Sequence, residues 1–151
     1  MNFLDLKVID EDGVEKPLRD VVLGRWTVLY FYPKDNTPGC TTEAKEFSEL
    51  LDEFERLGVQ VIGVSRDSQR SHLRFKGRYG LRVRLLSDPG AELHRALGAW
   101  GRKKRYGKEY EGAVRSTFIL SPEGEVVWKK VNVRAKGHAA EVLEVVRDLL
   151  S

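Results

Sequence analysis

The chain of 151 residues contains a single cysteine, Cys40. One cysteine excludes an intrachain disulfide framework, a Cys-x-x-Cys redox pair and a cysteine-rich zinc module. A lone thiol suits a reducing compartment, where it is not a liability. The sequence therefore leaves only those cysteine chemistries that need one sulfur.

Long hydrophobic runs are also missing. The longest nearly apolar run, residues 26–32, is far shorter than the roughly 18 residues that a membrane-spanning helix requires. Residues 1–5 show neither the basic region nor the apolar segment of a secretory signal. We therefore expect a cytoplasmic protein that has no membrane partner.

The length and the composition are those of an ordinary globular domain. Hydrophobic residues make up 41% of the chain and charged residues 32%, which excludes a disordered or membrane-embedded class. A chain of this length buries enough surface to hold its own core. Since no repeat, low-complexity tract or linker interrupts it, we expect a single domain over residues 1–151.

The net charge of +3 is small, but it is unevenly distributed. Residues 66–108 hold 13 Lys and Arg against 3 Asp and Glu, and they include the basic run at 102–105. Such a block can attract nucleic acid or an acidic partner. Because no aromatic interleaving or nucleic-acid motif accompanies it, we expect a solvated helix and loop, and no nucleic-acid partner.

Two apolar strands joined by a helix form the recognisable centre of the sequence. Residues 26–32 are β-branched and aromatic, which is typical of a strand buried on both faces of a sheet. Apolar residues then recur at helical spacing from 44 to 57, and Gly58 ends the helix. Residues 59–64 form the second strand, so the three elements predict a right-handed βαβ unit with parallel strands.

The flanking segments add further elements of both kinds. Ahead of the βαβ unit, alternation in residues 3–8 and a turn at 10–13 predict an N-terminal β-hairpin. Behind it we expect a helix at 68–79, a helix capped by Asp88 and ended by Gly98, a β-hairpin of 114–120 and 125–131, and a closing helix at 138–150. Together these elements predict an α/β fold with a sheet of mixed direction.

Cys40 lies where a thiol becomes reactive. Thr37 is a suitable N-cap and Pro38 a suitable first helical residue, which places Cys40 in the first helical turn. Unpaired N–H groups and the helix dipole there favour the thiolate, which is the nucleophile. The alternative is a buried structural cysteine. The polar surroundings of Cys40 favour the reactive interpretation.

Other cysteine chemistries lack the residues that they need. A phosphatase-type loop requires an arginine six residues after the cysteine, but that position is Glu46. A cysteine hydrolase requires a histidine base, and no spacing links His72, His94 or His138 to Cys40. We expect these histidines to be surface or packing residues. We expect no metal site and no cofactor.

The sequence around Cys40 resembles that of a known family. Pro33, Thr37 and Cys40 match the peroxiredoxin motif PxxxTxxC, and the string FYPKDNTPGCTTEA is similar to the peroxiredoxin Q, or bacterioferritin comigratory protein, branch. The likeness continues through residues 86–88, 100–101, 107–112 and 115–120. It implies a thioredoxin-like fold, with a central mixed β-sheet flanked by helices, and a thiol peroxidase that needs no metal, flavin or haem.

The resemblance also implies roles for individual residues. Cys40 would attack the terminal peroxide oxygen and become a sulfenic acid. Thr37 would hydrogen-bond to the thiolate and the peroxide, and Pro33 would shield the pocket from water. Arg115 would stabilise the thiolate and the charge that develops on the peroxide oxygens.

Physical arguments agree with the role of Arg115. A guanidinium offers charge-assisted donors to developing negative charge. If strand 114–120 runs antiparallel beside strand 26–32, as in the family fold, Arg115 arrives near Cys40. Gly39 and the backbone N–H of Cys40 are further candidate donors to a peroxide. Trp100 is a candidate wall of the site, with a packing role as the alternative.

The chain departs from the family pattern in one respect. Lys45 occupies the position where many members carry a resolving cysteine, and no cysteine follows on a later helix. We therefore expect a one-cysteine peroxidase, a monomer or weak homodimer, that reduces hydrogen peroxide and organic hydroperoxides. Its sulfenic acid would be reduced by thioredoxin, glutaredoxin or a small thiol. The alternative function is that of a thioredoxin-fold binding or holdase protein without peroxidase turnover.

Overall fold

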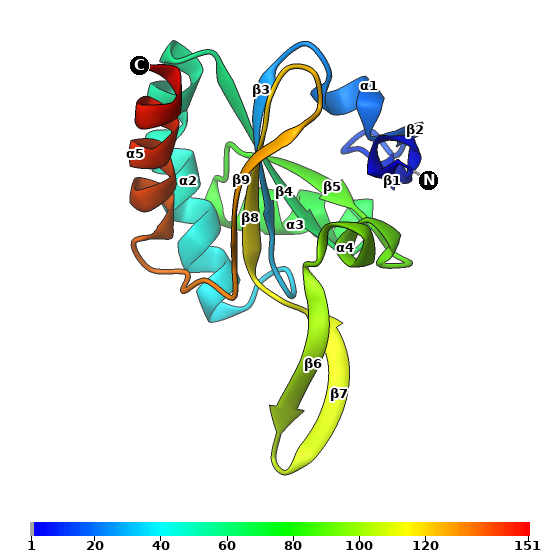
Figure 1. Ribbon diagram of the computed structural model, residues 1–151. Coiled ribbons are helices and arrows are strands. Elements are labelled where there is room, and N and C mark those ends of the chain that lie inside the picture. Colours follow the sequence, from blue (N-terminus) through cyan, green and yellow to red (C-terminus); the bar gives the residue numbers. More distant parts are fainter. Residues whose placement is uncertain (1) are drawn as a thin grey trace.

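The structure is a computed structural model, and it describes residues 2–151. A seven-stranded sheet forms its centre, with strand order β2-β1-β5-β4-β3-β8-β9 (Figure 1). Its strands are β1 (Lys7–Ile9), β2 (Glu15–Pro17), β3 (Trp26–Phe31), β4 (Val59–Ser65), β5 (Arg84–Ser87), β8 (Ser116–Leu120) and β9 (Val126–Val131). Strands β3, β4 and β5 are parallel and the other pairs antiparallel, so the predicted mixed sheet is confirmed.

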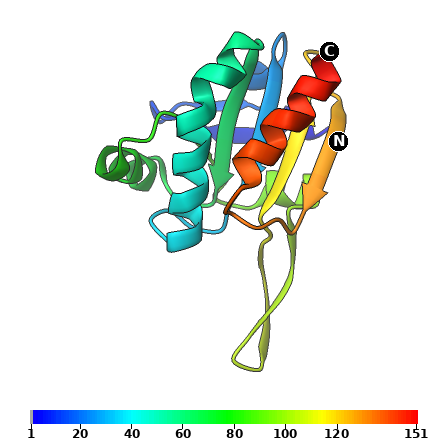
Figure 2. The ribbon, with the colours of Figure 1, turned by 90° about the vertical axis from the view of Figure 1, so that its left-hand side faces the viewer.

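Helices cover both faces of the sheet. They are α1 (Arg19–Val22), α2 (Pro38–Arg56), α3 (Gln69–Tyr79), α4 (Glu92–Leu97) and α5 (His138–Leu150). Helices α2 and α5 pack side by side on one face, and α1 and α4 lie on the other (Figures 1 and 2). This arrangement is the thioredoxin-like α/β fold that the sequence predicts.

Strand β3 shows why its sequence is apolar without interruption. Val28 and Tyr30 point into the core beneath α2 and α5, whereas Leu29 and Phe31 point into the core beneath α1 and α4. All four side chains are fully buried. A strand covered on both faces needs apolar residues at every position, which confirms the prediction from residues 26–32.

Most predicted elements are confirmed within one or two residues, but three expectations are wrong. Residues Phe3–Asp5 form a short 3-10 helix before the N-terminal hairpin, not part of a strand. The helix assigned to Asp88 begins at Glu92, because Ala91 adopts a left-handed conformation with φ 57°. Asp88 still caps it from outside, since its Oδ2 accepts the backbone N–H of His94 at 2.9 Å.

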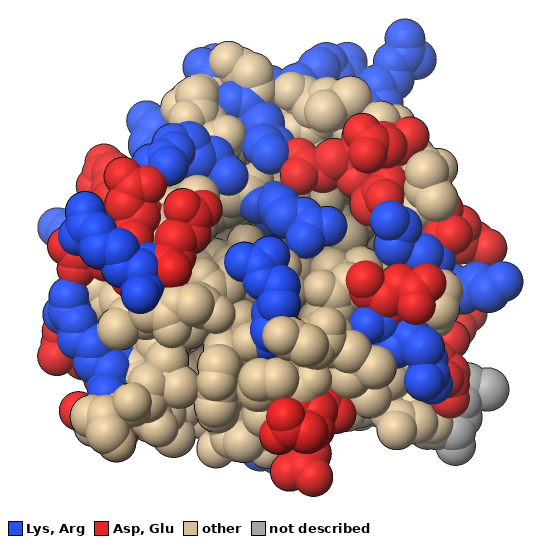
Figure 3. Space-filling model, turned by 90° about the horizontal axis from the view of Figure 1, so that it is seen from above, with Lys and Arg blue, Asp and Glu red and all other residues tan. Residues whose placement is uncertain are grey.

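The third error concerns the basic run. Residues 102–105 are neither helix nor loop: they belong to β6 (Trp100–Arg105), which pairs with β7 (Lys108–Ala113) in a separate antiparallel hairpin. We call this hairpin the arm. It projects from the end of the molecule at which α2 begins (Figures 1 and 2). The opposite end, viewed in Figure 3, carries basic and acidic side chains interleaved.

Candidate active site

The site lies at the edge of the sheet where β3 ends and β8 begins. The two strands are antiparallel, and Phe31 at the end of β3 pairs with Ser116 at the start of β8. Arg115, one residue before β8, therefore lies next to the loop that leaves β3. That loop, residues 32–37, leads to α2, in which Cys40 is the third residue.

Cys40 occupies the first turn of α2, as predicted. Thr37 stands at the N-cap with extended dihedrals and Pro38 is the first helical residue. The helix is 19 residues long, so its dipole and its free N–H groups act at this turn. The Cys40 side chain is buried, with 2% of its surface exposed, and it contacts the core beneath α2. The sulfur is thus both buried and located at the start of a helix.

Arg115 reaches the sulfur directly. Its Nη2 donates to Sγ of Cys40 at 3.4 Å. Burial alone would lower the pKa of Arg115, but the charges of Glu43 and Cys40 hold that pKa above its ordinary value. The guanidinium therefore stays a cation next to the sulfur.

Glu43, which was not among the predicted site residues, holds Arg115 in place. Its Oε1 accepts from Nη1 of Arg115 at 2.6 Å, and its side chain is fully buried. Burial raises the pKa of Glu43 to about 7, although the charge of Arg115 opposes that rise. Its Oε2 has no hydrogen-bond partner within residues 2–151. An acid three residues after Cys40 lies on the same helix face, and that spacing was the available signal.

Gly39 leaves room for the guanidinium. A Cβ atom at position 39 would lie 3.1 Å from Nη2 of Arg115 and 3.9 Å from Cβ of Ala135. The first of these contacts is closer than ordinary van der Waals packing. Glycine at this position therefore permits the approach of Arg115 to Cys40.

Thr37 and Pro33 lie on the loop that leads to Cys40. Both are half-buried. The Thr37 hydroxyl donates to the carbonyl oxygen of Lys34 at 2.8 Å and makes no cap hydrogen bond to the helix. Its N-cap position is thus confirmed, while its oxygen bonds within the loop and keeps its acceptor capacity.

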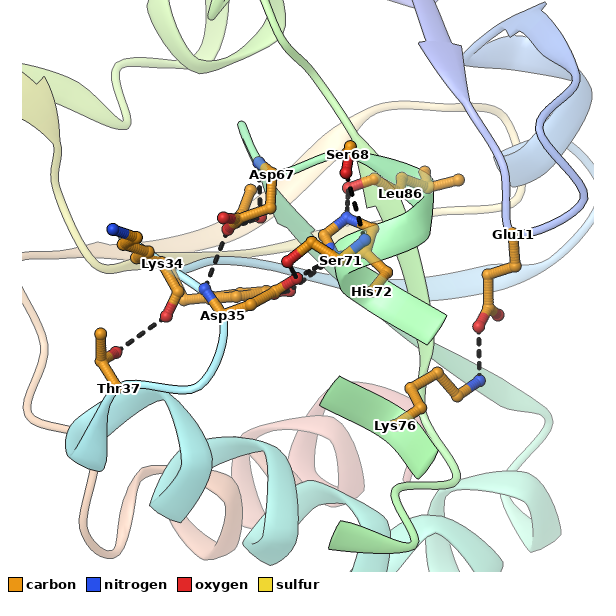
Figure 4. A network of polar contacts seen from close by, with 12 residues as sticks. Glu11, Lys34, Asp35, Thr37, Asp67, Ser68, Ser71, His72, Lys76 and Leu86 are labelled. Carbon is orange, nitrogen blue, oxygen red and sulfur yellow. Dashed lines mark hydrogen bonds and ion pairs between the residues drawn. The ribbon is translucent and has the colours of Figure 1, made fainter. Parts of the chain in front are cut away.

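Asp35 fixes the same loop to α3 (Figure 4). Its Oδ1 accepts from the Tyr32 hydroxyl at 2.6 Å, and its Oδ2 lies 2.7 Å from Nδ1 of His72. The Ser71 hydroxyl donates to the same Oδ2 at 2.8 Å, and the Asp35 N–H donates to Asp67 at 2.9 Å. We call these contacts of Asp35 the clamp. They hold the loop between Pro33 and Thr37 in one conformation.

The comparisons with known proteins agree with this geometry. Residues 2–129 match the sequence model of the AhpC/TSA family. The chain belongs to the AhpC/TSA family.

Relatives of this AhpC/TSA chain are named peroxiredoxins. The putative peroxiredoxin bcp of Helicobacter pylori J99 is 48% identical over 140 residues, which are 93% of this chain and 91% of that protein. Peroxiredoxin Bcp of Xanthomonas campestris is 47% identical over 145 residues, which are 95% and 89% of the two chains. The protein is therefore a peroxiredoxin, a thiol peroxidase of the Bcp/PrxQ type.

Solved structures show the same fold. The bacterioferritin comigratory protein of Xanthomonas campestris superposes with a TM-score of 0.91 at 43% identity, over 99% of this chain and 94% of that one. PrxQ of Xylella fastidiosa gives 0.92 at 38% identity, over 100% and 94%. The Xanthomonas protein has been solved as two different cysteine-to-serine mutants, so it has at least two cysteines where this peroxiredoxin has one.

Trp100 stands at the base of the arm of this peroxiredoxin. Its ring packs edge-on against His94, and the guanidinium of Arg66 lies 5.2 Å from its centroid. Its Nε1 has no hydrogen-bond partner within the described chain, so no polar contact joins Trp100 to Cys40. These contacts favour a packing role for Trp100 over a role as a wall of the site.

Of the two roles predicted for the histidines, surface or packing, the structure shows packing. His72, His94 and His138 are all buried, with at most 3% of their surface exposed. Each has an acidic partner: Asp35, Asp88 and Glu141, respectively. Each ring can be buried because an acidic side chain pairs with it.

Residues 2–151 contain no cluster of three or more His, Cys, Asp or Glu side chains suited to a metal ion. None of the helices in that range is both long enough and apolar enough to cross a bilayer.

Proposed function

We propose that this peroxiredoxin reduces hydrogen peroxide and organic hydroperoxides through a sulfenic acid on Cys40. The observation that carries the proposal is the 3.4 Å contact between Arg115 and the sulfur at the start of α2. The Xanthomonas campestris relative is described as reducing alkyl peroxides, which supports organic substrates here. In this proposal residues 1–151 act as one domain, a monomer or weak homodimer in the cytoplasm.

The chemistry assigns each neighbour a task. The Cys40 thiolate attacks the terminal peroxide oxygen, the O–O bond breaks, and sulfur loses the electron pair that the leaving oxygen gains. Arg115 stabilises the charge on both oxygens, since its Nη2 already donates to the sulfur. The Thr37 oxygen and the N–H groups of Gly39 and Cys40 orient the peroxide, and Pro33 limits the access of water.

Reduction requires a second molecule. Cys40 is the only cysteine, so its sulfenic acid condenses with an external thiol, forming a mixed disulfide and releasing water. A second thiol then attacks the mixed disulfide and restores Cys40. Thioredoxin, glutaredoxin or a small thiol supplies these electrons. With no resolving cysteine, excess peroxide converts Cys40 to sulfinic acid.

The experiment measures turnover with each reductant in turn. Peroxide consumption is followed with thioredoxin, glutaredoxin, glutathione or cysteine present, for the wild type and for Cys40→Ser. We expect turnover with at least one thiol, a mixed disulfide on Cys40 in the mass spectrum, and no turnover of Cys40→Ser. Turnover by Cys40→Ser at the wild-type rate would contradict the role of Cys40.

The arm favours one alternative function, a binding protein for acidic partners. Arg102, Lys104 and Arg105 are exposed on β6, and Tyr106 at its tip is 92% exposed. Binding through such a surface weakens steeply as ionic strength rises, whereas reduction of an uncharged peroxide does not. A protein that shows salt-sensitive binding and no peroxidase turnover would favour this alternative.

A further inference from the structure

The arm begins and ends beside the proposed active site. Strand β7 ends at Ala113, two residues before Arg115, and the N–H of Val114 donates to the carbonyl oxygen of Ala99 at 2.9 Å. Figures 1 and 2 both show the arm leaving the end of the molecule at which α2 starts. A side chain of the arm that points back along it therefore approaches the segment that carries Arg115.

Lys103 is that side chain. Arg102, Lys104 and Arg105 are exposed on β6, but Lys103 is half-buried. Lys103 pairs with Tyr110, yet its Cδ lies 3.5 Å from where a Cβ of Gly112 would stand. Gly112 is two residues nearer the body than Tyr110. The Lys103 side chain thus runs from β6 toward the body, across a glycine that gives it room.

The electrostatics agree with this direction. Burial lowers the pKa of Lys103 below its ordinary value, repulsion by Arg115 lowers it further, and the charge of Cys40 opposes the decrease. Cys40 on α2 and Arg115 just before β8 therefore both act on the ammonium group of Lys103, although Lys103 belongs to the arm.

The proposed peroxidase reaction needs an acid for its last proton. Attack on the terminal oxygen expels hydroxide or an alkoxide, which must be protonated. Arg115 does not give up a proton in proteins. Glu43 can hold a proton, because burial raises its pKa to about 7, but its side chain is fully buried and its Oε1 accepts from Arg115. Lys103 is a cation with a transferable proton on the same side of the molecule.

We propose that Lys103 is the general acid that protonates the leaving oxygen when Cys40 reacts with a peroxide. This inference rests on the proposed role of Cys40. The S–O bond forms as the O–O bond breaks, and sulfur is oxidised by the two electrons that the leaving oxygen receives. The Lys103 ammonium gives that oxygen its proton, which produces water or an alcohol, and the neutral amine regains a proton from solvent.

The test compares peroxides whose leaving groups differ in basicity. Lys103→Gln and wild type are mixed with hydrogen peroxide, tert-butyl hydroperoxide or peroxyacetic acid in a stopped-flow instrument. The pH is one at which the thiolate absorbance of each protein is at its plateau. Peroxyacetic acid releases acetate, which needs no proton. We expect Lys103→Gln to lose about 100-fold in rate with the first two peroxides and little with peroxyacetic acid.

Two further variants separate proton transfer from charge. Lys103→Arg keeps the cation but cannot give up a proton, so it stays slow with hydrogen peroxide. Lys104→Gln removes the same charge from the exposed face of β6 and serves as the control, with wild-type rates expected throughout. Recovery in Lys103→Arg, or an equal loss with all three peroxides, would overturn the general-acid role. A wild type that reacts slowly with every peroxide would instead contradict the proposed function.

Discussion

Arg115 and Cys40 lie 75 residues apart in the sequence, and Nη2 of one is 3.4 Å from Sγ of the other. The antiparallel register of β3 and β8 creates this contact, because it places the start of β8 beside the end of β3. A guanidinium that is itself held by the buried Glu43 then meets a sulfur at the start of a long helix. Three elements thus converge on one thiol.

Replacing Arg115 tests the consequence of this contact. Arg115→Ala leaves Glu43 buried without a partner, at a cost of about 3–5 kcal/mol in folding free energy. Arg115→Lys keeps a cation but loses the planar guanidinium, whose two terminal nitrogens donate to Glu43 and to Cys40. We expect Arg115→Lys to react with hydrogen peroxide about 10- to 100-fold more slowly than wild type, by stopped-flow fluorescence. Arg102→Lys, on the exposed face of the arm, is the control. Oxidation of Arg115→Lys at the wild-type rate would refute the role of the guanidinium.

Gly39 offers a gentler perturbation of the same contact. In Gly39→Ala the new Cβ lies 3.1 Å from Nη2 of Arg115, so the guanidinium must move away by a few tenths of an ångström. We expect roughly a 10-fold slower oxidation, since small misplacements of a charged group are costly. Alanine favours the helix by up to about 1 kcal/mol, so the fold is retained. Gly77→Ala in α3, where nothing lies within 4 Å of the new methyl, is the matched control. Equal rates for the two variants would contradict the prediction.

The raised pKa of Glu43 predicts a pH-dependent stability. Because burial raises that pKa to about 7 from the ordinary 4.5, the folded state holds a proton that the unfolded chain has already released. The stabilising contribution is complete below about pH 4.5 and disappears as the pH rises through about 7, a change of about 3 kcal/mol. Urea unfolding at a series of pH values measures it. Glu43→Gln cannot titrate, so the difference between the two unfolding curves should change over this range. A constant difference would show that Glu43 does not titrate there.

The clamp predicts a link between α3 and reactivity. His72→Asn removes a ring whose two nitrogens lie 2.7 Å from Asp35 and 3.0 Å from the carbonyl oxygen of Leu86. We expect faster amide hydrogen exchange in residues 33–37 and slower oxidation of Cys40, with about 1–3 kcal/mol lost in stability. Leu73→Ala, at an exposed neighbour on α3, is the control. Unchanged exchange in the loop of His72→Asn would mean that the clamp does not hold it.

The fold and the Cys40–Arg115 pair could be predicted from the sequence for a physical reason. Local signals predict the elements themselves: a strand that is apolar throughout, a Thr-Pro helix start, and a hairpin with its turn at 121–124. The resemblance to the peroxiredoxin family implies that strands 26–32 and 114–120 are neighbours, which brings Arg115 to Cys40. The Pro33, Thr37 and Cys40 motif adds the expected register. The roles of the site residues, the external reductant and the oligomeric state stay predictions.

Other features depend on contacts that no local pattern contains. The clamp joins the loop after β3 to α3 and β4, so it exists only once the sheet has formed. The arm was missed because its strands are polar on both faces and bury little, which removes the alternation that marks a strand. The histidines can be buried because each has an acidic partner, which for His72 lies on a distant segment and for His138 lies one helical turn away.

The most direct test mixes fully reduced protein with one equivalent of hydrogen peroxide and follows tryptophan fluorescence by stopped flow. The product is then trapped with a sulfenic-acid reagent and located by mass spectrometry. We predict oxidation orders of magnitude faster than that of free cysteine, with the sulfenic acid on Cys40. A rate like that of free cysteine would contradict the account, because it would mean that Arg115 and the helix start do not activate the thiol.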